Sequence, residues 1–276
     1  MNRASAPVHP HRKPATLAAG LAVRTTSAHE HRRAGDYPAA AKVLRTAIAA
    51  ADAALGPDGA ECGTLLNELG MVAKAAGNFV EAEAAYRRAL AIEGSRGEAG
   101  AMTADILHNL AGLAHARGDA ESALTLAQRG IGIRRDLLPH DACGLAADRA
   151  ALAAILIDLG RHAQARPMLD EPLRGGAPRY DTAVALHNLG SSQYRQGNPG
   201  RAAVTLHRAL ALKAAELGRR HPDLAITLYN LGRCLESLGW RRLAHRQWRR
   251  ALAVLDGAVA ADHPTLVACR QQLTRQ

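Results

Sequence analysis

Aromatic side chains are scarce in this sequence. Phe, Trp and Tyr make up 3% of its 276 residues, whereas hydrophobic residues make up 48%. A core must therefore be packed mainly by alanine, leucine and valine. No stretch shows the alternating or β-branched pattern of a strand, and good helix formers predominate almost throughout. The composition argues against a β fold and predicts an all-α protein.

The chain also lacks the motifs of catalysis and of metal binding. It contains no GxxxxGK[ST], GxSxG or HExxH, and Gly130-Ile131-Gly132 lacks the third glycine of a dinucleotide-binding loop. Its four cysteines form no CxxC pair, and we expect buried, unpaired thiols. They are Cys62, Cys143, Cys234 and Cys269. We therefore expect no enzymatic activity, no cofactor and no metal site.

Long apolar runs are missing as well. None approaches the roughly 20 residues that a membrane span needs. Ala15–Val23 follows a basic start, as in a signal peptide, but this run is short and no clear cleavage site follows it. We expect a soluble, cytoplasmic protein without a membrane partner. Residues 1–14 contain three prolines and are expected to form a disordered basic tail.

What the sequence does contain is a repeated helix–turn–helix pattern. Leu186–Ala209 predicts a helix with leucine and glycine on one face, a turn at Gly197 and a second helix rich in alanine. Leu228–Ala251 repeats this pattern 42 residues later. Six glycines at intervals of 42, 41, 42, 37 and 42 residues mark the turns: Gly35, Gly77, Gly118, Gly160, Gly197 and Gly239.

The second helix of each unit has a regular order of small and large side chains. Five residues after the turn glycine stands alanine in all six units: Ala40, Ala82, Ala123, Ala165, Ala202 and Ala244. Four residues further stand mostly large side chains: Leu44, Tyr86, Ala127, Leu169, Leu206 and Trp248. A small residue lets a neighbouring helix approach, and a large one fills the space beside it. The pattern predicts helical hairpins that stack in a row.

This order of Leu-Gly on the first helix and alanine, large residue, alanine on the second resembles the tetratricopeptide repeat. The 42-residue period and linkers such as Gly218–Ala225 are similar to the longer variety found in kinesin light chains and many bacterial proteins. The resemblance covers residues 21–276 and implies an all-α, right-handed superhelical solenoid of about six repeats with a C-terminal capping helix. We place the solenoid at residues 15–276, with repeats at about 16–55, 61–94, 101–138, 142–175, 179–217 and 222–257 and the cap at 263–276.

The fourth repeat departs from this pattern. Pro167 and Pro172 fall within its second helix, and Gly175-Gly176 follows. Proline removes a helical hydrogen bond and clashes with the preceding turn. We therefore expect an interrupted second helix and an irregular superhelix at this repeat.

The formal charge of +10 raises the question of an acidic partner such as nucleic acid. Most arginine pairs fall on second helices or linkers, where we expect a solvated convex face: Arg87-Arg88, Arg134-Arg135, Arg219-Arg220, Arg241-Arg242 and Arg249-Arg250. Aromatic residues that could stack on bases are few. Nucleic acid is therefore an unfavoured partner, and a nucleic-acid-associated or regulatory role stays the alternative function.

The first helices are expected to line a concave groove. The ninth residue before the turn glycine is Glu68, Asn109, Asn188 or Asn230, and the residue before each of these is Asn67, His108, His187 or Tyr229. Asparagine amides can bond an extended peptide backbone largely regardless of its sequence, and the resemblance to light-chain repeats implies such a clamp. The alternative is that these asparagines bond the neighbouring repeat and hold the superhelix together.

Positive charge accompanies the asparagines on the same inner surface. Lys74, Arg195 and Arg233 follow the asparagine positions of their helices and are expected to face the same groove. The sequence therefore predicts a non-enzymatic scaffold that binds a protein or an extended peptide segment, with acidic segments favoured.

Overall fold

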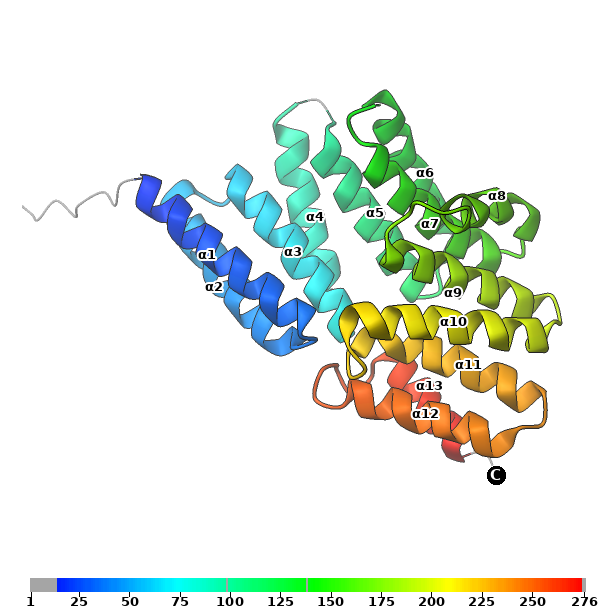
Figure 1. Ribbon diagram of the computed structural model, residues 1–276. Helices are drawn as coiled ribbons and strands as arrows, with labels where there is room; N and C mark the ends of the chain where they lie inside the picture. The colour runs from blue at the N-terminus through cyan, green and yellow to red at the C-terminus, as the bar shows by residue number, and fades with distance from the viewer. Residues whose placement is uncertain (1–13, 98, 138, 275–276) are drawn as a thin grey trace, which may run out of the picture.

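The computed structural model describes residues 14–97, 99–137 and 139–274. These residues form thirteen α-helices and one short 3-10 helix, with no strand among them. The helices follow one another as antiparallel hairpins in a curved row (Figure 1). The predicted all-α solenoid is therefore confirmed. The predicted tail lies outside the described residues, apart from Pro14, where the first helix begins.

Six hairpins and a final single helix make up the row. The hairpins are α1 (Pro14–Arg33) with α2 (Tyr37–Leu55), α3 (Ala60–Ala76) with α4 (Phe79–Ser95), α5 (Ala101–Ala116) with α6 (Ala120–Asp136), α7 (Ala142–Asp158) with α8 (His162–Leu173), α9 (Arg179–Arg195) with α10 (Pro199–Leu217), and α11 (Ala225–Ser237) with α12 (Arg241–Leu255). The 3-10 helix η1 (Pro222–Leu224) precedes α11, and α13 (Pro264–Thr274) packs on α12.

Each hairpin turns at one of the six predicted glycines. All six have φ between +72° and +86°. Residues with a Cβ adopt this left-handed backbone conformation only with steric strain. In the first three hairpins an Asp or Asn side chain caps the second helix by accepting a hydrogen bond from a backbone N–H of its first turn: Asp36, Asn78 and Asp119. Local chemistry thus fixes where one helix ends and its partner begins.

The helices of a hairpin cross at the positions that the repeat pattern predicts. All six alanines that follow the turn glycines are 0% exposed, and the large side chains four residues later are at most 4% exposed. On the first helix a glycine receives the large side chain of the second. A Cβ on Gly190 would lie 2.7 Å from Leu206, and one on Gly232 would collide with Trp248. The predicted register is therefore confirmed.

The fourth repeat differs from its prediction. Helix α8 is not interrupted: it runs through Pro167 and ends at Leu173, directly after Pro172. It is still the shortest second helix, with 12 residues. Each proline removes one helical hydrogen bond and so weakens the helix, but the backbone keeps its helical path. Only Ala165 and Leu169 of α8 are buried.

The superhelix closes on itself (Figure 1). At one contact, the first hairpin turn meets the linker before α11, and the Tyr37 hydroxyl donates to Asp223 over 2.7 Å. At the other, the second turn meets the linker before α13, and the backbone N–H of Ala260 donates to the carbonyl of Ala76 over 2.7 Å. The two contacts are equivalent, because turns and linkers are both 42 residues apart.

Two turn glycines are enclosed by this closure. A Cβ on Gly35 would collide with the ring of Pro222, and one on Gly77 would lie 2.9 Å from His263 Cδ2. The other four turn glycines have no atom within 4 Å of such a Cβ. Closure therefore depends on close backbone approach at these two turns, and it converts the concave face into a chamber bounded by both ends of the solenoid.

Candidate functional site

The inner surface of the solenoid contains two adjoining cavities. The first, of about 230 Å³, is lined mainly by α7, α9 and α11. The second, of about 380 Å³, lies where the first two hairpins meet the C-terminal linkers. Both are lined by His115, Asp158 and Ile226, so they form one continuous chamber.

The chamber brings together six of the ten predicted site residues. His187, Asn188, Arg195, Asn230 and Arg233 line the first cavity. Lys74 lines the second. The other four line neither cavity: Asn67, His108, Asn109 and Tyr229. The predicted site therefore gathers at repeats five and six, and the N-terminal part of the ladder lies outside the chamber.

Each groove asparagine donates one hydrogen bond to the preceding repeat. Asn109 Nδ2 bonds Asn67 Oδ1 at 3.0 Å, Asn188 Nδ2 bonds the carbonyl of Ala150 at 3.1 Å, and Asn230 Nδ2 bonds Ser191 Oγ at 3.4 Å. These contacts brace neighbouring repeats. An asparagine amide has a second N–H and a carbonyl oxygen. Asn188 and Asn230 can therefore still form hydrogen bonds with a group that enters the chamber.

A carboxylate joins the two cavities. Asp158 of α7 accepts from His115 Nε2 over 2.6 Å and from Arg195 over 2.5 Å. Burial alone would raise the pKa of Asp158, but the contacts with His115 and Arg195 outweigh it and lower the pKa. The positive charge of Arg195 is therefore largely compensated by Asp158 of the same chain.

Arg233 and Lys74 are cations of the chamber without a carboxylate contact in the described part of the chain. The guanidinium of Arg233 lies 4.7 Å from the ring centroid of Tyr194 and 5.9 Å from that of Tyr229, a cation–π arrangement. Burial lowers the pKa of the Lys74 ammonium, and Asp223 opposes this effect. Both cations are thus available to an anionic group that enters the chamber.

His187 is a neutral hydrogen-bonding group. Its Nδ1 lies 3.0 Å from Thr227 Oγ1, across the boundary between repeats five and six. Burial, and then the nearby Lys213 ammonium, lower the pKa of His187 to about 3. It therefore carries no charge near neutral pH.

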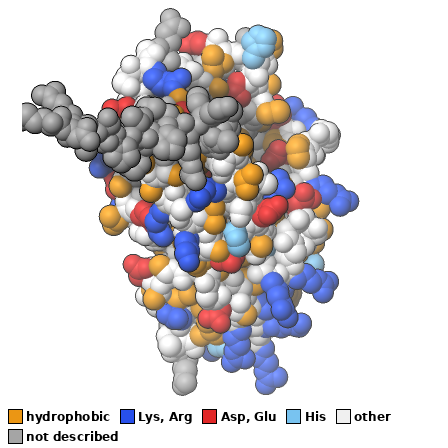
Figure 2. Space-filling model, turned by 90° about the vertical axis from the view of Figure 1, so that its left-hand side faces the viewer, with side chains coloured by type: hydrophobic (Ala, Val, Ile, Leu, Met, Phe, Trp, Pro, Cys, Tyr) orange, Lys and Arg blue, Asp and Glu red, His pale blue; other side chains and the backbone are white. Residues whose placement is uncertain are grey.

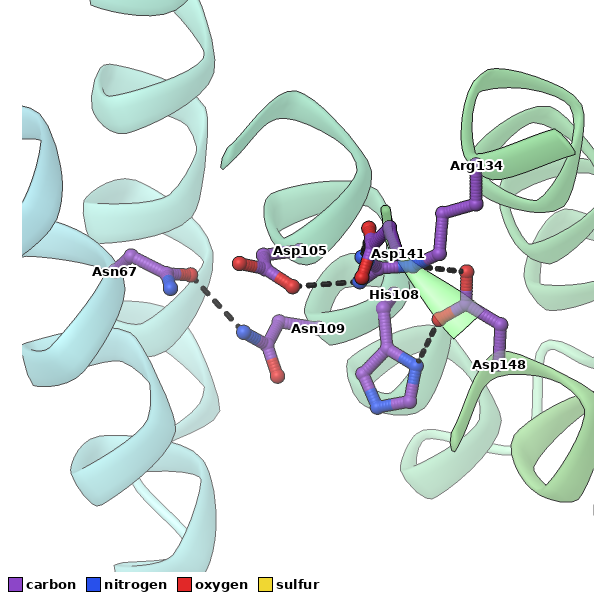
Figure 3. A network of polar contacts seen from close by, with 7 residues as sticks. All are labelled: Asn67, Asp105, His108, Asn109, Arg134, Asp141 and Asp148. Carbon is purple, nitrogen blue, oxygen red and sulfur yellow. Dashed lines mark hydrogen bonds and ion pairs between the residues drawn. The ribbon is translucent and has the colours of Figure 1, made fainter. Parts of the chain in front are cut away.

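Figure 3 shows a polar cluster between repeats three and four that includes His108, with the bonded pair Asn67 and Asn109 beside it. Arg134, only 3% exposed, reaches Asp105, Asp141 and Asp148 with separate nitrogens, and His108 Nδ1 lies 2.7 Å from Asp148. The prediction of a solvated basic face is therefore wrong for Arg134. Its guanidinium is needed inside because Asp148 is itself 2% exposed.

Several chamber residues escaped the sequence reasoning. His115 and Tyr194 lie six residues after the asparagine positions of their helices, so extending the same count would have found them. Asp223 accepts from both Tyr37 and Tyr180, but it lies in a linker where the repeat count gives no signal. Its role depends on closure, which joins residues 186 positions apart.

The cysteines and the metal question have simple outcomes. Cys62, Cys234 and Cys269 are buried, whereas Cys143, in the first turn of α7, is exposed. The prediction of four buried thiols is therefore wrong for Cys143. Across residues 14–97, 99–137 and 139–274, no three His, Cys, Asp or Glu side chains are arranged to hold a metal ion. Nor does any helix of these segments have the length and hydrophobicity of a membrane span.

Comparison with protein families decides the classification. A tetratricopeptide repeat model matches residues 25–95, 61–136 and 181–257, and a second one matches residues 149–171. The chain belongs to the tetratricopeptide repeat family. The matches span more than half of the sequence and include the repeat-four region, where the pattern is least regular.

Solved structures share this tetratricopeptide fold. The Rap protein, in complex with Competence and Sporulation Factor, is 16% identical with a TM-score of 0.60, covering 92% of this chain and 86% of Rap. The apo quorum sensor NprR of B. thuringiensis is 13% identical with a TM-score of 0.57, covering 91% of this chain and 68% of NprR. BtubC (BKLC) of P. vanneervenii is 21% identical with a TM-score of 0.49, covering 86% and 90%. A comparison with curated protein sequences finds no match.

Proposed function

We propose that this tetratricopeptide repeat protein is a non-enzymatic adaptor that binds an extended peptide segment of a partner protein in its inner chamber. The observation that carries the proposal is the convergence of Asn188, Asn230 and Arg233 on one cavity. Two amides can bond a peptide backbone, and the arginine can pair with an acidic side chain.

The apolar part of the lining suits the side chains of such a segment. Ala154, Ile157 and Ile226 lie among the polar groups of the first cavity. Pockets of a few hundred cubic ångströms with a few convergent polar groups are typical binding sites. The closure of the superhelix limits the site to a short stretch of peptide, because both ends of the solenoid bound the chamber.

The charge of the chamber favours an acidic segment. Arg233 and Lys74 have no carboxylate contact in the described residues, whereas Asp158 already bonds two basic groups. An entering carboxylate would therefore meet Arg233 in the first cavity, whereas in the second cavity Lys74 lies together with Asp223. The Rap protein was crystallised with Competence and Sporulation Factor, so the fold is compatible with a bound ligand.

The test is the double variant Asn188→Ala/Asn230→Ala. A partner is first isolated by pull-down from the native host and identified by mass spectrometry, and its binding segment is mapped. Binding of that segment, measured by calorimetry, should weaken about tenfold or more, since each amide contributes roughly 0.5–1.5 kcal/mol.

Asn67→Ala/Asn109→Ala is the matched control. These asparagines also brace neighbouring repeats, but they line neither cavity. The control should lose comparable stability and keep its affinity. If both double variants lost affinity equally, or if neither did, the asparagines would act only as braces and the proposal would fail.

A further inference from the structure

Helix α12 presents an unusual charge pattern on the convex side of the solenoid, away from the chamber. It carries five exposed arginines and no carboxylate: Arg241, Arg242, Arg246, Arg249 and Arg250. None of the five forms an ion pair with any carboxylate of residues 14–97, 99–137 or 139–274. Lys and Arg side chains gather at the lower right of Figure 2, toward the end of the molecule that holds the C-terminal repeats.

An apolar hollow of about 380 Å³ lies between α12 and α10. Leu231 and Leu235 of α11 form its floor. Val204 of α10 and Leu243 of α12 form its walls and are 65% and 46% exposed. Gln247 on the rim accepts a bond from Arg250 over 3.2 Å. The hollow is therefore apolar inside and basic along the α12 edge.

The equivalent gap between α2 and α4 is closed by two ion pairs. Arg45 bonds Glu81 at 2.6 Å, and Arg88 bonds Asp52 at 2.6 Å. The residues 162 positions later occupy the same places relative to the turn glycines. There Arg250 replaces Arg88, but Ala214 stands where Asp52 would supply the carboxylate.

The first ion pair is replaced in the same way. His207 stands at the position of Arg45, and Leu243 at that of Glu81. Where the N-terminal repeats close the gap with their own carboxylates, the C-terminal repeats leave leucine, valine and an arginine without its anion. A partner that complements this surface must therefore supply both carboxylates and apolar side chains.

We propose that the hollow between α10 and α12 docks an acidic amphipathic helix of a partner protein. Its apolar face would fill the space between Val204 and Leu243, and its carboxylates would meet Arg246 and Arg250. These arginines follow Leu243 by three and seven residues and so share its face of α12. A nucleic acid would match the arginines but leave the apolar walls in water, so the hollow favours a protein.

The probe is a capped 16-residue peptide with leucine at every third or fourth position and glutamate on both flanks of the leucine stripe. Its affinity for the full chain is measured by fluorescence anisotropy. The peptide should bind, and a version with glutamine for glutamate should bind about tenfold more weakly. Binding should also weaken as salt is raised from about 50 to 500 mM.

Two variants should each weaken binding about tenfold: Arg246→Glu/Arg250→Glu and Val204→Ser/Leu243→Ser. Arg129→Glu/Arg135→Glu on α6 is the charge-matched control, since both arginines are exposed and Arg129 has the register of Arg250. Val80→Ser is the apolar control, since Val80 is 76% exposed on α4. Both controls should bind as the parent does.

Three results would overturn the proposal. The peptide could fail to bind at about 1 mM, it could bind the site variants and the controls equally, or only phosphatidylserine vesicles or a single-stranded oligonucleotide could bind the basic face. Asn188→Ala/Asn230→Ala should leave the peptide's affinity unchanged, because these asparagines line the chamber and the hollow shares no lining residue with it.

Discussion

At the scale of single residues, His187 links the chamber to the stability of the fold. Burial, and then the Lys213 ammonium, hold its pKa at about 3, below the ordinary value of 6.5. Between these values the unfolded chain binds a proton at His187 and the folded chain does not. Acid therefore favours unfolding in this window, and stability rises with pH through it.

The variant His187→Gln keeps a polar group but cannot titrate. Between pH 7.5 and pH 5 the free energy of unfolding of the parent should fall by about 1–2 kcal/mol more than that of this variant, because only the parent binds a proton at residue 187 on unfolding. Urea unfolding followed by circular dichroism at the two pH values measures the difference. Equal losses in both proteins would show that His187 is accessible to protons in the folded state.

Arg134 offers a second prediction at this scale. It is buried with Asp148 and reaches two further carboxylates, so Arg134→Met should cost about 3–5 kcal/mol by leaving a buried charge uncompensated. The exposed neighbour Arg135 is the control, and Arg135→Met should cost at most about 0.5 kcal/mol. Adding Asp148→Asn to Arg134→Met should recover part of the loss in thermal unfolding. A double variant no more stable than Arg134→Met would contradict a role for Asp148.

At the scale of elements, α8 is the weak joint of the solenoid. It has 12 residues, two prolines and only two buried side chains, and Gly175-Gly176 follows it. Among internal segments, amide exchange should therefore be fastest over residues 166–178.

Replacing Pro167 with alanine tests the cause. Pro167→Ala restores the N–H that can bond the carbonyl of Ala163 four residues earlier, so exchange within α8 should slow several-fold in mass-spectrometric measurements. The remaining repeats serve as internal controls and should not change. Uniform protection across repeats three to five in the parent would rule out a weak joint.

At the scale of the whole molecule, closure depends on two turns. Gly35→Ala/Gly77→Ala should place methyl groups against Pro222 and His263, separate the ends and raise the radius of gyration in small-angle scattering. Gly118→Ala/Gly160→Ala is matched in backbone strain, with φ of +84° and +72°, but has open space at both sites. This control should lose roughly 1–2 kcal/mol of stability per substitution, because alanine is strained in the left-handed conformation, and it should keep the shape of the parent. Identical scattering from the two double variants would mean that the turns do not hold the molecule closed.

The repeat pattern was predictable from sequence because it is local. Six turn glycines, six buried alanines and the large residues beside them follow from helix period and side-chain size, and each acts within one hairpin. The inner placement of Asn188 and Asn230 followed from the same count. The continuity of α8 did not, since packing of Ala165 and Leu169 against their neighbours offsets the local cost of proline.

The sequence by itself thus determined the helices, their pairing and the row in which they stack, because all of these arise from contacts between neighbouring segments. Only the tertiary structure decided that the row closes, that Tyr37 reaches Asp223, that Arg134 is buried and that the asparagines bond the repeat before them. Closure results from a small rotation at every repeat, and no single repeat determines the total rotation. The chamber depends on closure, and the open hollow between α10 and α12 depends on the few positions where the copies differ, such as Asp52 and Ala214.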